Sequence, residues 1–183
     1  MSPPATPSAP GSAGPAPARA RIVVDADACP VRDEALTVAL RHGAALWLVS
    51  NGGIRPHPHP SVRTVIVAEG PDAADRWIAE RVGPGDVCVT GDLPLAARCL
   101  EAGARVLRHD GEAFTDANIR ERLAMRDLMA DLRAAHPLAA GGGAKPFGRA
   151  DRSRFLDGLE RAMRAAAADA AAARARGPEG TGC

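Results

Sequence analysis

The sequence lacks several features that would point to particular functions. It has no Tyr, three Phe and two Trp among 183 residues. Proteins that bind single-stranded nucleic acid without sequence preference stack bases on aromatic side chains, so this shortage disfavours that mode. Hydrophobic residues make up 46% of the chain. A core built from Val, Leu, Ile and Ala is therefore expected, in a chain long enough for one globular domain.

Strong net charge is also missing. The formal net charge is +1, and Lys145 is the only lysine. No overall electrostatic field would therefore draw the protein to nucleic acid.

The four cysteines show no CxxC pair and no zinc-ligand spacing, which predicts reduced, mostly buried thiols in a cytoplasmic protein. No apolar run approaches the roughly 20 residues that span a membrane. The N-terminus lacks the pattern of a secretory signal, so no membrane partner is expected.

Composition divides the chain into three parts. Residues 1–20 are mainly Pro, Ala, Ser and Gly and predict a disordered arm, because they bury too little apolar surface to offset the entropy of ordering. Residues 21–165 carry the apolar patterns of an α/β domain. Residues 166–183 predict an Ala-rich flexible tail.

Strands and helices alternate in the predicted domain. Alternation of this kind indicates an α/β fold, a three-layer sandwich with a mainly parallel five-stranded sheet. The expected strands cover residues 22–25, 45–49, 62–67, 87–90 and 104–107, and the expected helices cover 31–41, 72–82, 94–103, 118–135 and 151–173.

Polar side chains follow the expected strands at their carboxyl ends, where ligands bind in open α/β sheets. Two acids follow the first strand, an amide follows the second, and further acids follow the third and fourth. Because the strands are expected to be parallel, these side chains should meet at one edge of the sheet. They are Asp25, Asp27, Asn51, Asp72, Asp75, Thr90 and Asp92.

Carboxylates gathered at one edge repel one another, so raised pKa values, arginine partners or a divalent cation must compensate. Ligands that offer only oxygen suit Mg²⁺ or Mn²⁺. Such an ion would orient a water molecule and stabilise the phosphorus centre of a phosphodiester during hydrolysis.

Structural roles are the alternative for each acid. Asp72 and Asp92 stand where helix caps are expected, and Asp75 would complete a capping arrangement after Asp72. Asp25 and Asp27 are harder to explain in this way, because two acids at the end of a buried strand are costly without a partner.

Other polar residues are weaker candidates. His57 and His59 are either a metal pair or part of an exposed Pro-rich loop, and the loop is favoured. Cys29 is expected to be a buried small residue. The arginines near Arg120 predict a solvated helix face paired with acids, with a phosphate-contacting flank as the alternative.

Several separate motifs, in the same order, resemble the YaiI/YqxD family of uncharacterised bacterial proteins. The resemblance covers about Arg21 to Met163. It rests on Val24 to Val31, Asp72 to Asp75, Thr90 to Ala96, Asn118 to Leu123, Met125 to Asp127, and Asp151-Arg152 before Phe155.

That family resembles the PIN-like nucleases in fold, and Thr90-Gly91-Asp92 matches the Thr-x-Asp turn of PIN domains. The resemblance implies a Mg²⁺- or Mn²⁺-dependent nuclease acting on RNA. Its catalytic residues would be Asp25, Asp27 and Asp92, the metal ligands Asp25, Asp92 and one of Asp72 or Asp75, and the substrate contacts Asn51, Thr90 and Arg120. The sequence departs from the family in the unusual loop Gly52 to Pro60 and in Arg76, where an acid is frequent.

Two other functions fit the same acids. Asp25-x-Asp27 after an apolar strand also resembles the nucleophile and acid of haloacid-dehalogenase-like phosphatases, in which Asp25 would attack a phosphate. That class needs a lysine between Asn51 and Gly91. The sequence has none there, and Arg63 would have to replace it. The class also needs a further acid after Asp92, where Leu95 and Ala96 stand. A non-catalytic module that binds a metal or nucleic acid is the third possibility.

Overall fold

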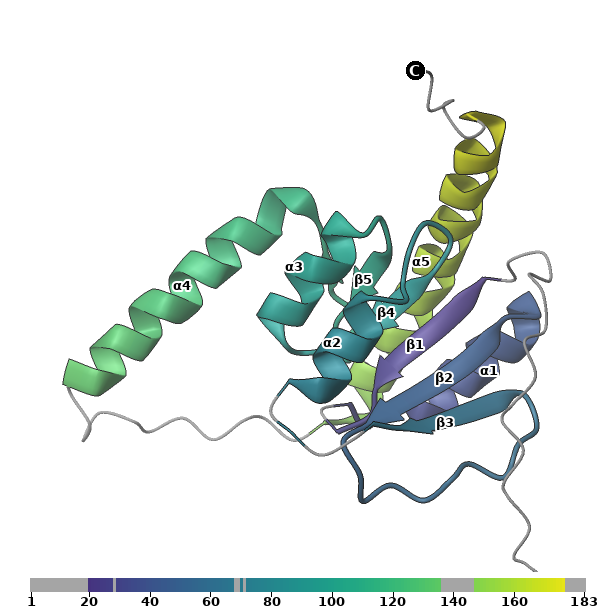
Figure 1. Ribbon diagram of the computed structural model, residues 1–183, viewed down its shortest axis with the longest axis horizontal. Helices are drawn as coiled ribbons and strands as arrows, with labels where there is room; N and C mark the ends of the chain where they lie inside the picture. Colours follow the sequence, from purple (N-terminus) through teal and green to yellow (C-terminus); the bar gives the residue numbers. More distant parts are fainter. Residues whose placement is uncertain (1–19, 28, 68–69, 71, 136–146, 177–183) are drawn as a thin grey trace, which may run out of the picture.

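The computed structural model describes residues 20–27, 29–67, 70, 72–135 and 147–176 (Figure 1). The predicted arm, except for Ala20, and the last seven residues of the predicted tail lie outside this part, as do residues 136–146. The described elements are β1 (Arg21–Asp25), α1 (Arg32–His42), β2 (Ala45–Ser50), β3 (Val62–Ile66), α2 (Ala73–Ala79), β4 (Val87–Val89), α3 (Leu93–Glu101), β5 (Arg105–Leu107), β6 (Ala113–Phe114), α4 (Asp116–Ala135) and α5 (Arg149–Arg176).

The strands form one sheet in the order β3-β2-β1-β4-β5-β6. Pairing is parallel from β3 through to β5, and β6 pairs antiparallel with β5. The predicted α/β class is confirmed, but the expected number of five strands is wrong, because the sheet is mixed and has six. Strand β6 was missed because two residues, Ala113 and Phe114, are too short to show a periodic pattern.

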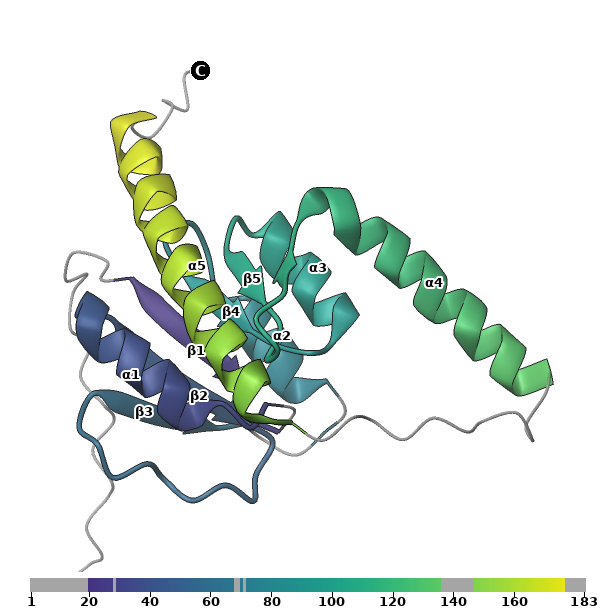
Figure 2. The same ribbon diagram turned by 180° about the vertical axis from the view of Figure 1, so that it is seen from behind.

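Helices cover both faces of the sheet (Figures 1 and 2). The chain moves from β1 through α1 to β2 in one direction along the sheet, and from β4 through α3 to β5 in the other. Because such crossovers are right-handed, helices that serve opposite directions lie on opposite faces. Accordingly, α1 and α5 cover one face, and α2 and α3 cover the other.

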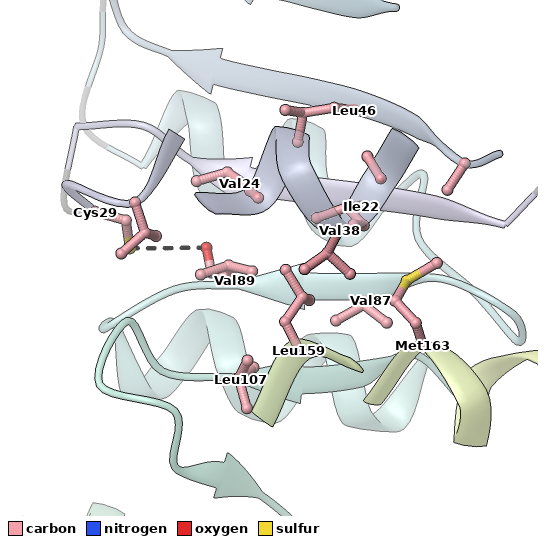
Figure 3. Close-up of a cluster of buried hydrophobic side chains, with 14 of the residues drawn as sticks. Ile22, Val24, Cys29, Val38, Leu46, Val87, Val89, Leu107, Leu159 and Met163 are labelled. Carbon is pink, nitrogen blue, oxygen red and sulfur yellow. Dashed lines mark hydrogen bonds between the residues drawn. The ribbon is translucent and has the colours of Figure 1, made fainter. Parts of the chain in front are cut away.

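The central strand β1 is buried on both sides, which explains its unbroken apolar run. Ile22 and Val24 face the core under α1 and α5, and Val23 faces the core under α2 and α3. Figure 3 shows Leu159 and Met163 of α5 in the first of these cores. Burial of each such side chain contributes about 1.5–3 kcal/mol, so the sheet is fixed from both faces.

Helix α5 continues through the first part of the predicted tail and ends at Arg176. Ala166 is fully buried, and the Arg105 Nε atom donates a hydrogen bond of 2.6 Å to Asp169. The alanine-rich composition therefore forms a helix over residues 166–176, which contacts the rest of the domain through Ala166 and Asp169. Within the described residues, no helix is both long and apolar enough to cross a membrane.

Helix α4 extends away from the sheet (Figure 1). Near its start, Ile119 is buried and Leu123 packs against the core under α3. Farther along, large apolar side chains are about half exposed. They are Met125, Leu128, Met129 and Leu132.

Candidate active site at the carboxyl edge of the sheet

The strand order reverses between β1 and β4, and that is where α/β proteins form a crevice outside the carboxyl ends of their strands. Asp25 is the last residue of β1, and Thr90 directly follows β4. The first acid of the Asp25-x-Asp27 motif and the Thr90-Gly91-Asp92 turn therefore lie at the carboxyl ends of the two strands that flank the reversal point.

Asp25 is buried, with 6% of its surface exposed, and is held by Thr90. The Thr90 hydroxyl donates a hydrogen bond of 3.0 Å to Oδ2 of Asp25. The same hydroxyl oxygen accepts a bond of 3.0 Å from the backbone N–H of Asp92. Because that N–H occupies the oxygen, the hydroxyl proton is directed at Asp25. Thr90 thus links the two acids and is placed as a positioning residue.

The pKa of Asp25 is raised above its usual value, chiefly because burial disfavours the charged form. Hydrogen bonds from the Thr90 hydroxyl and from the backbone of Asp27 oppose this shift, while the charges of Asp27 and Asp92 add to it. The carboxylate therefore lies in surroundings that favour its neutral form.

Asp75 lies in the first turn of α2 and belongs to the same electrostatic group. Burial raises its pKa first, and the charges of Asp92, Asp25 and Asp72 raise it further. Arg98 lowers it, as the smallest of the influences. Acids from three separate parts of the chain therefore repel one another here, as expected for the carboxyl ends of parallel strands.

Asp92 caps α3, as predicted. Its Oδ1 atom accepts a hydrogen bond of 2.8 Å from the backbone N–H of Leu95, and Pro94 occupies the first turn. This bond fixes the carboxylate near Asp25 and Asp75, and it uses only one of the two carboxylate oxygens.

Asp27 makes different contacts from Asp25. It is exposed, and its carboxylate accepts hydrogen bonds from the Ser50 hydroxyl at 2.5 Å and from the backbone N–H of Asn51 at 2.8 Å. These bonds join the end of β1 to the end of β2. Asp27 therefore orders the edge of the sheet, and Ser50, which was not among the predicted site residues, is its main partner.

The predicted cap at Asp72 is wrong. Asp72 precedes α2 with φ at 57°, in the left-handed region, and its side chain makes no capping hydrogen bond. Instead, Oδ1 of Asn51 accepts a bond of 2.9 Å from the backbone N–H of Ala74. Asn51 was predicted to contact substrate, and its side-chain oxygen is used here to hold the start of α2.

The acids at this edge have no ion-pair partner within the described part of the chain. In that part, no three His, Cys, Asp or Glu side chains lie close enough together to hold a metal ion directly. The unpaired acids are Asp25, Asp27, Asp72, Asp75 and Asp92.

Arg120 is exposed on α4, and no contact in the described residues links it to these carboxylates. A different set of basic residues lines a cavity of about 400 Å³ beside Gly91. The sequence places Arg122 and Arg126 one helical turn apart, which indicates a shared face, but the position of α4 beside Gly91 is visible only in the fold. The lining residues are Gly91, Leu93, Arg108, His109, Phe114, Arg122, Met125, Arg126 and Met129.

A larger cavity of about 570 Å³ is lined in part by Asp27, and its lining carries charges of both signs, including Glu34 and Arg152. His57 also lines it, with Nε2 3.7 Å from Asp33. Each ring nitrogen Nδ1 of His57 and His59 accepts a bond from a backbone N–H two residues later. The two histidines therefore order their own loop, in line with the favoured loop interpretation.

Cys29 is a buried core residue, as predicted. It is 3% exposed, and its thiol lies 3.9 Å from the carbonyl oxygen of Val89 (Figure 3). Burial, with the charge of Asp25 as a smaller contribution, raises its pKa to about 12. A thiol with this pKa stays protonated at neutral pH and is a poor nucleophile.

Arg63, the cation that the phosphatase alternative would use, packs against an aromatic ring on the sheet. The Arg63 guanidinium lies 5.2 Å from the centre of the Trp47 ring, with which it pairs across β3 and β2. Leu95 and Ala96, where a further acid would be needed, are fully buried. These positions therefore do not supply the cation and the further acid that the phosphatase class needs.

The fold and this edge define an α/β protein with a doubly wound strand order and a group of acids at the reversal point. A family model described as "Uncharacterized BCR, YaiI/YqxD family" matches residues 23–165. The chain belongs to this family, as the motifs predicted.

Related proteins cover about four-fifths of the chain. A UPF0178 protein of Ruegeria pomeroyi is 69% identical over 149 residues, which are 81% of this chain and 97% of the relative. One of Roseobacter denitrificans is 66% identical, over 80% of this chain and 96% of the relative. One of Parvibaculum lavamentivorans is 57% identical, over 79% and 93%. No solved structure matches the chain.

Proposed function

We propose that the protein hydrolyses phosphodiester bonds in RNA with the help of a divalent cation bound at the carboxyl edge of the sheet. One observation carries this proposal. Asp25, Asp75 and Asp92 come together from the end of β1, the first turn of α2 and the turn after β4, repel one another as charged groups, and have no ion-pair partner in the described residues. Such a group is costly to a protein unless it serves a ligand or a reaction.

The donor chemistry fits Mg²⁺ or Mn²⁺. All candidate ligands are carboxylate oxygens, and Mg²⁺ keeps several of its waters and is often bound through only one or two carboxylates. A direct three-ligand cage is therefore not required. Asp25 and Asp92 would hold the ion, with Asp75 or Asp72 as a further ligand. When bound, the ion would supply Lewis-acid stabilisation of the negative charge on the phosphoryl oxygens.

The chain's own residues would hold the carboxylates of the site in position. Thr90 holds Oδ2 of Asp25 and so fixes the direction of its other oxygen, Oδ1. Without the ion, burial raises the pKa of Asp25, and a bound cation would favour the charged form that the site needs. Asp27, engaged by Ser50 and Asn51, would keep the loops after β1 and β2 in register. The RNA substrate is an inference from the resemblance to PIN-like nucleases.

Cleavage of end-labelled single-stranded RNA by the full chain, with Mn²⁺ or with EDTA, tests this function. The wild-type protein should cleave only with the metal, and Asp25→Asn and Asp92→Asn should each lower the rate by about a hundredfold or more. Asp131→Asn is the matched control, because it is the same chemical change at an acid that is exposed on α4. Its rate should equal that of the wild type.

Three results would contradict the proposal. Full activity of both site variants would show that the acids are not involved. Hydrolysis of p-nitrophenyl phosphate without cleavage of RNA would favour the phosphatase. Metal binding without any hydrolysis would favour a non-catalytic module.

A further inference from the structure

The cavity beside Gly91 differs in charge from the edge next to it. Every charged side chain in its lining is an arginine, and they come from the loop after β5 and from α4. Gly91 itself separates Thr90 from Asp92. A basic cavity therefore begins one residue away from the acids of the proposed active site.

The arginines of the cavity are paired in ways that leave donors available. Arg108 lies 3.4 Å from Asp110, Arg122 pairs with Glu112, and Arg126 lies 3.4 Å from Asp127. These pairs are partly exposed, and such pairs contribute little to stability. Each guanidinium carries five N–H donors, so an added phosphate would find donors without breaking the pairs.

Apolar side chains form a wall of the same cavity, beside these arginines. Met125 and Met129 line the cavity with 54% and 47% of their surface exposed, although side chains of this kind are usually covered. Phe114 and Leu93 continue the wall, and the Arg122 guanidinium lies 5.5 Å from the centre of the Phe114 ring. Flexible methionines adapt to flat aromatic surfaces, which suits contact with a nucleobase.

His109 supplies an independent sign of a missing ligand. Its Nδ1 atom is buried and is the one such side-chain nitrogen or oxygen without a hydrogen-bond partner in the described part of the chain. A Cβ atom placed on Gly91 would lie 3.9 Å from it. Buried polar atoms nearly always have a partner, and a ligand in the cavity would supply one for this atom.

We propose that this cavity binds one nucleotide of the substrate strand, with its phosphate on the arginines and its base against the methionine wall. The volume of about 400 Å³ lies in the range of small-ligand pockets. The assignment rests on the proposed function for the identity of the strand, but the binding itself needs neither the metal nor the acids. The cavity would hold the strand beside the bond that the carboxylates act on.

Titration with adenosine 5′-monophosphate, followed by NMR of the isotopically labelled full chain in EDTA, tests the proposal. Millimolar nucleotide should shift the amide signals of Gly91 and His109. Arg126→Glu should weaken binding by at least about tenfold, because it removes charged hydrogen bonds to the phosphate. Arg164→Glu on α5, an exposed arginine outside this cavity, is the matched control and should bind as the wild type does.

Adenosine and inorganic phosphate separate the two halves of the site, and each should bind more weakly than the nucleotide. Unchanged binding by Arg126→Glu, equal binding of adenosine, or no shift at Gly91 and His109 would overturn the assignment. Asp25→Asn should bind the nucleotide normally. Nucleotide binding without RNA cleavage would therefore reject only the proposed function. RNA cleavage without nucleotide binding at this cavity would reject only the assignment of the cavity as a nucleotide site.

Discussion

Two buried aspartates at opposite ends of neighbouring strands differ in the partners of their carboxylates. Asp25 ends β1 and is 6% exposed, and Asp86 precedes β4 and is 5% exposed. Asp86 receives two bonds from the Arg21 guanidinium, at 2.9 and 2.5 Å, and one of 3.0 Å from the backbone of Gly83. Asp25 receives hydrogen bonds from neutral donors only and faces other acids.

The difference extends to other acids of the described chain. Asp169 is paired with Arg105, and Glu160 with Arg41 and His42, so both carboxyl groups have a pKa below its usual value. Asp25 and Asp75 have raised pKa values instead. Paired acids stabilise the fold, while the unpaired acids at the carboxyl edge are kept at a cost to it. That cost is the physical reason to assign them a function.

The largest effect expected from this contrast is stabilisation by a divalent cation. A ligand that binds only the folded state stabilises it by about 2.7 kcal/mol at a hundredfold excess over its dissociation constant. Thermal unfolding of the wild type with Mn²⁺ should show this increase, and Asp25→Asn should show little of it. An equal increase in Asp86→Asn and Asp25→Asn would place the ion elsewhere.

A second effect sharpens the contrast through stability alone. Asp86→Asn should lower the free energy of unfolding by about 2 kcal/mol, because it leaves the partly buried Arg21 without its charged acceptor. Asp25→Asn should not lower it, since it removes a repelled charge and keeps an acceptor for Thr90. Urea denaturation of both variants measures the difference. Equal losses would show that Asp25 is as structural as Asp86.

A smaller effect concerns the helix that carries Asp75. Asn51→Ala should cost about 1 kcal/mol, because it removes the acceptor for the backbone N–H of Ala74 at the start of α2. Asp72→Gly should stabilise by up to about 1 kcal/mol, since Asp72 has a left-handed backbone and no capping bond. Urea denaturation of the two variants distinguishes these outcomes, and a loss in Asp72→Gly would restore Asp72 as the cap.

The finest distinction is in pH dependence. In metal-free protein, a carboxyl group with a raised pKa favours folding fully below its ordinary value of 3.8, and this contribution is lost as pH rises through the folded-state pKa. The stability of Asp25→Asn relative to the wild type should therefore increase from acid toward neutral pH. Unfolding in urea with EDTA across that range measures it. A constant difference would mean that Asp25 is not strained in its charged form.

Much of this site was predictable from the sequence because two simple rules apply to it. Strands buried on both faces need unbroken apolar runs, as in β1 and β2, and parallel strands bring their carboxyl ends to one edge. Those rules placed Asp25, Asp75 and Asp92 together. The cap at Asp92 followed from its position before Pro94.

The remainder depends on conformation that residue types do not reveal. Asp72 has the composition of a cap, but its left-handed backbone turns the side chain away from that role. Ser50 and Asn51 became partners of Asp27 and Ala74 only because adjacent loops meet in space. The basic cavity depends on the path of α4 past Gly91, which no local pattern determines.

Crystals of the full chain soaked in Mn²⁺ test the central claim most directly. Anomalous scattering locates the ion without reference to activity. The account predicts an anomalous peak between Asp25 and Asp92 in the wild type and its loss in Asp25→Asn. A peak only at other acids would contradict it. So would the absence of any peak in the crystal when the dissolved protein binds Mn²⁺.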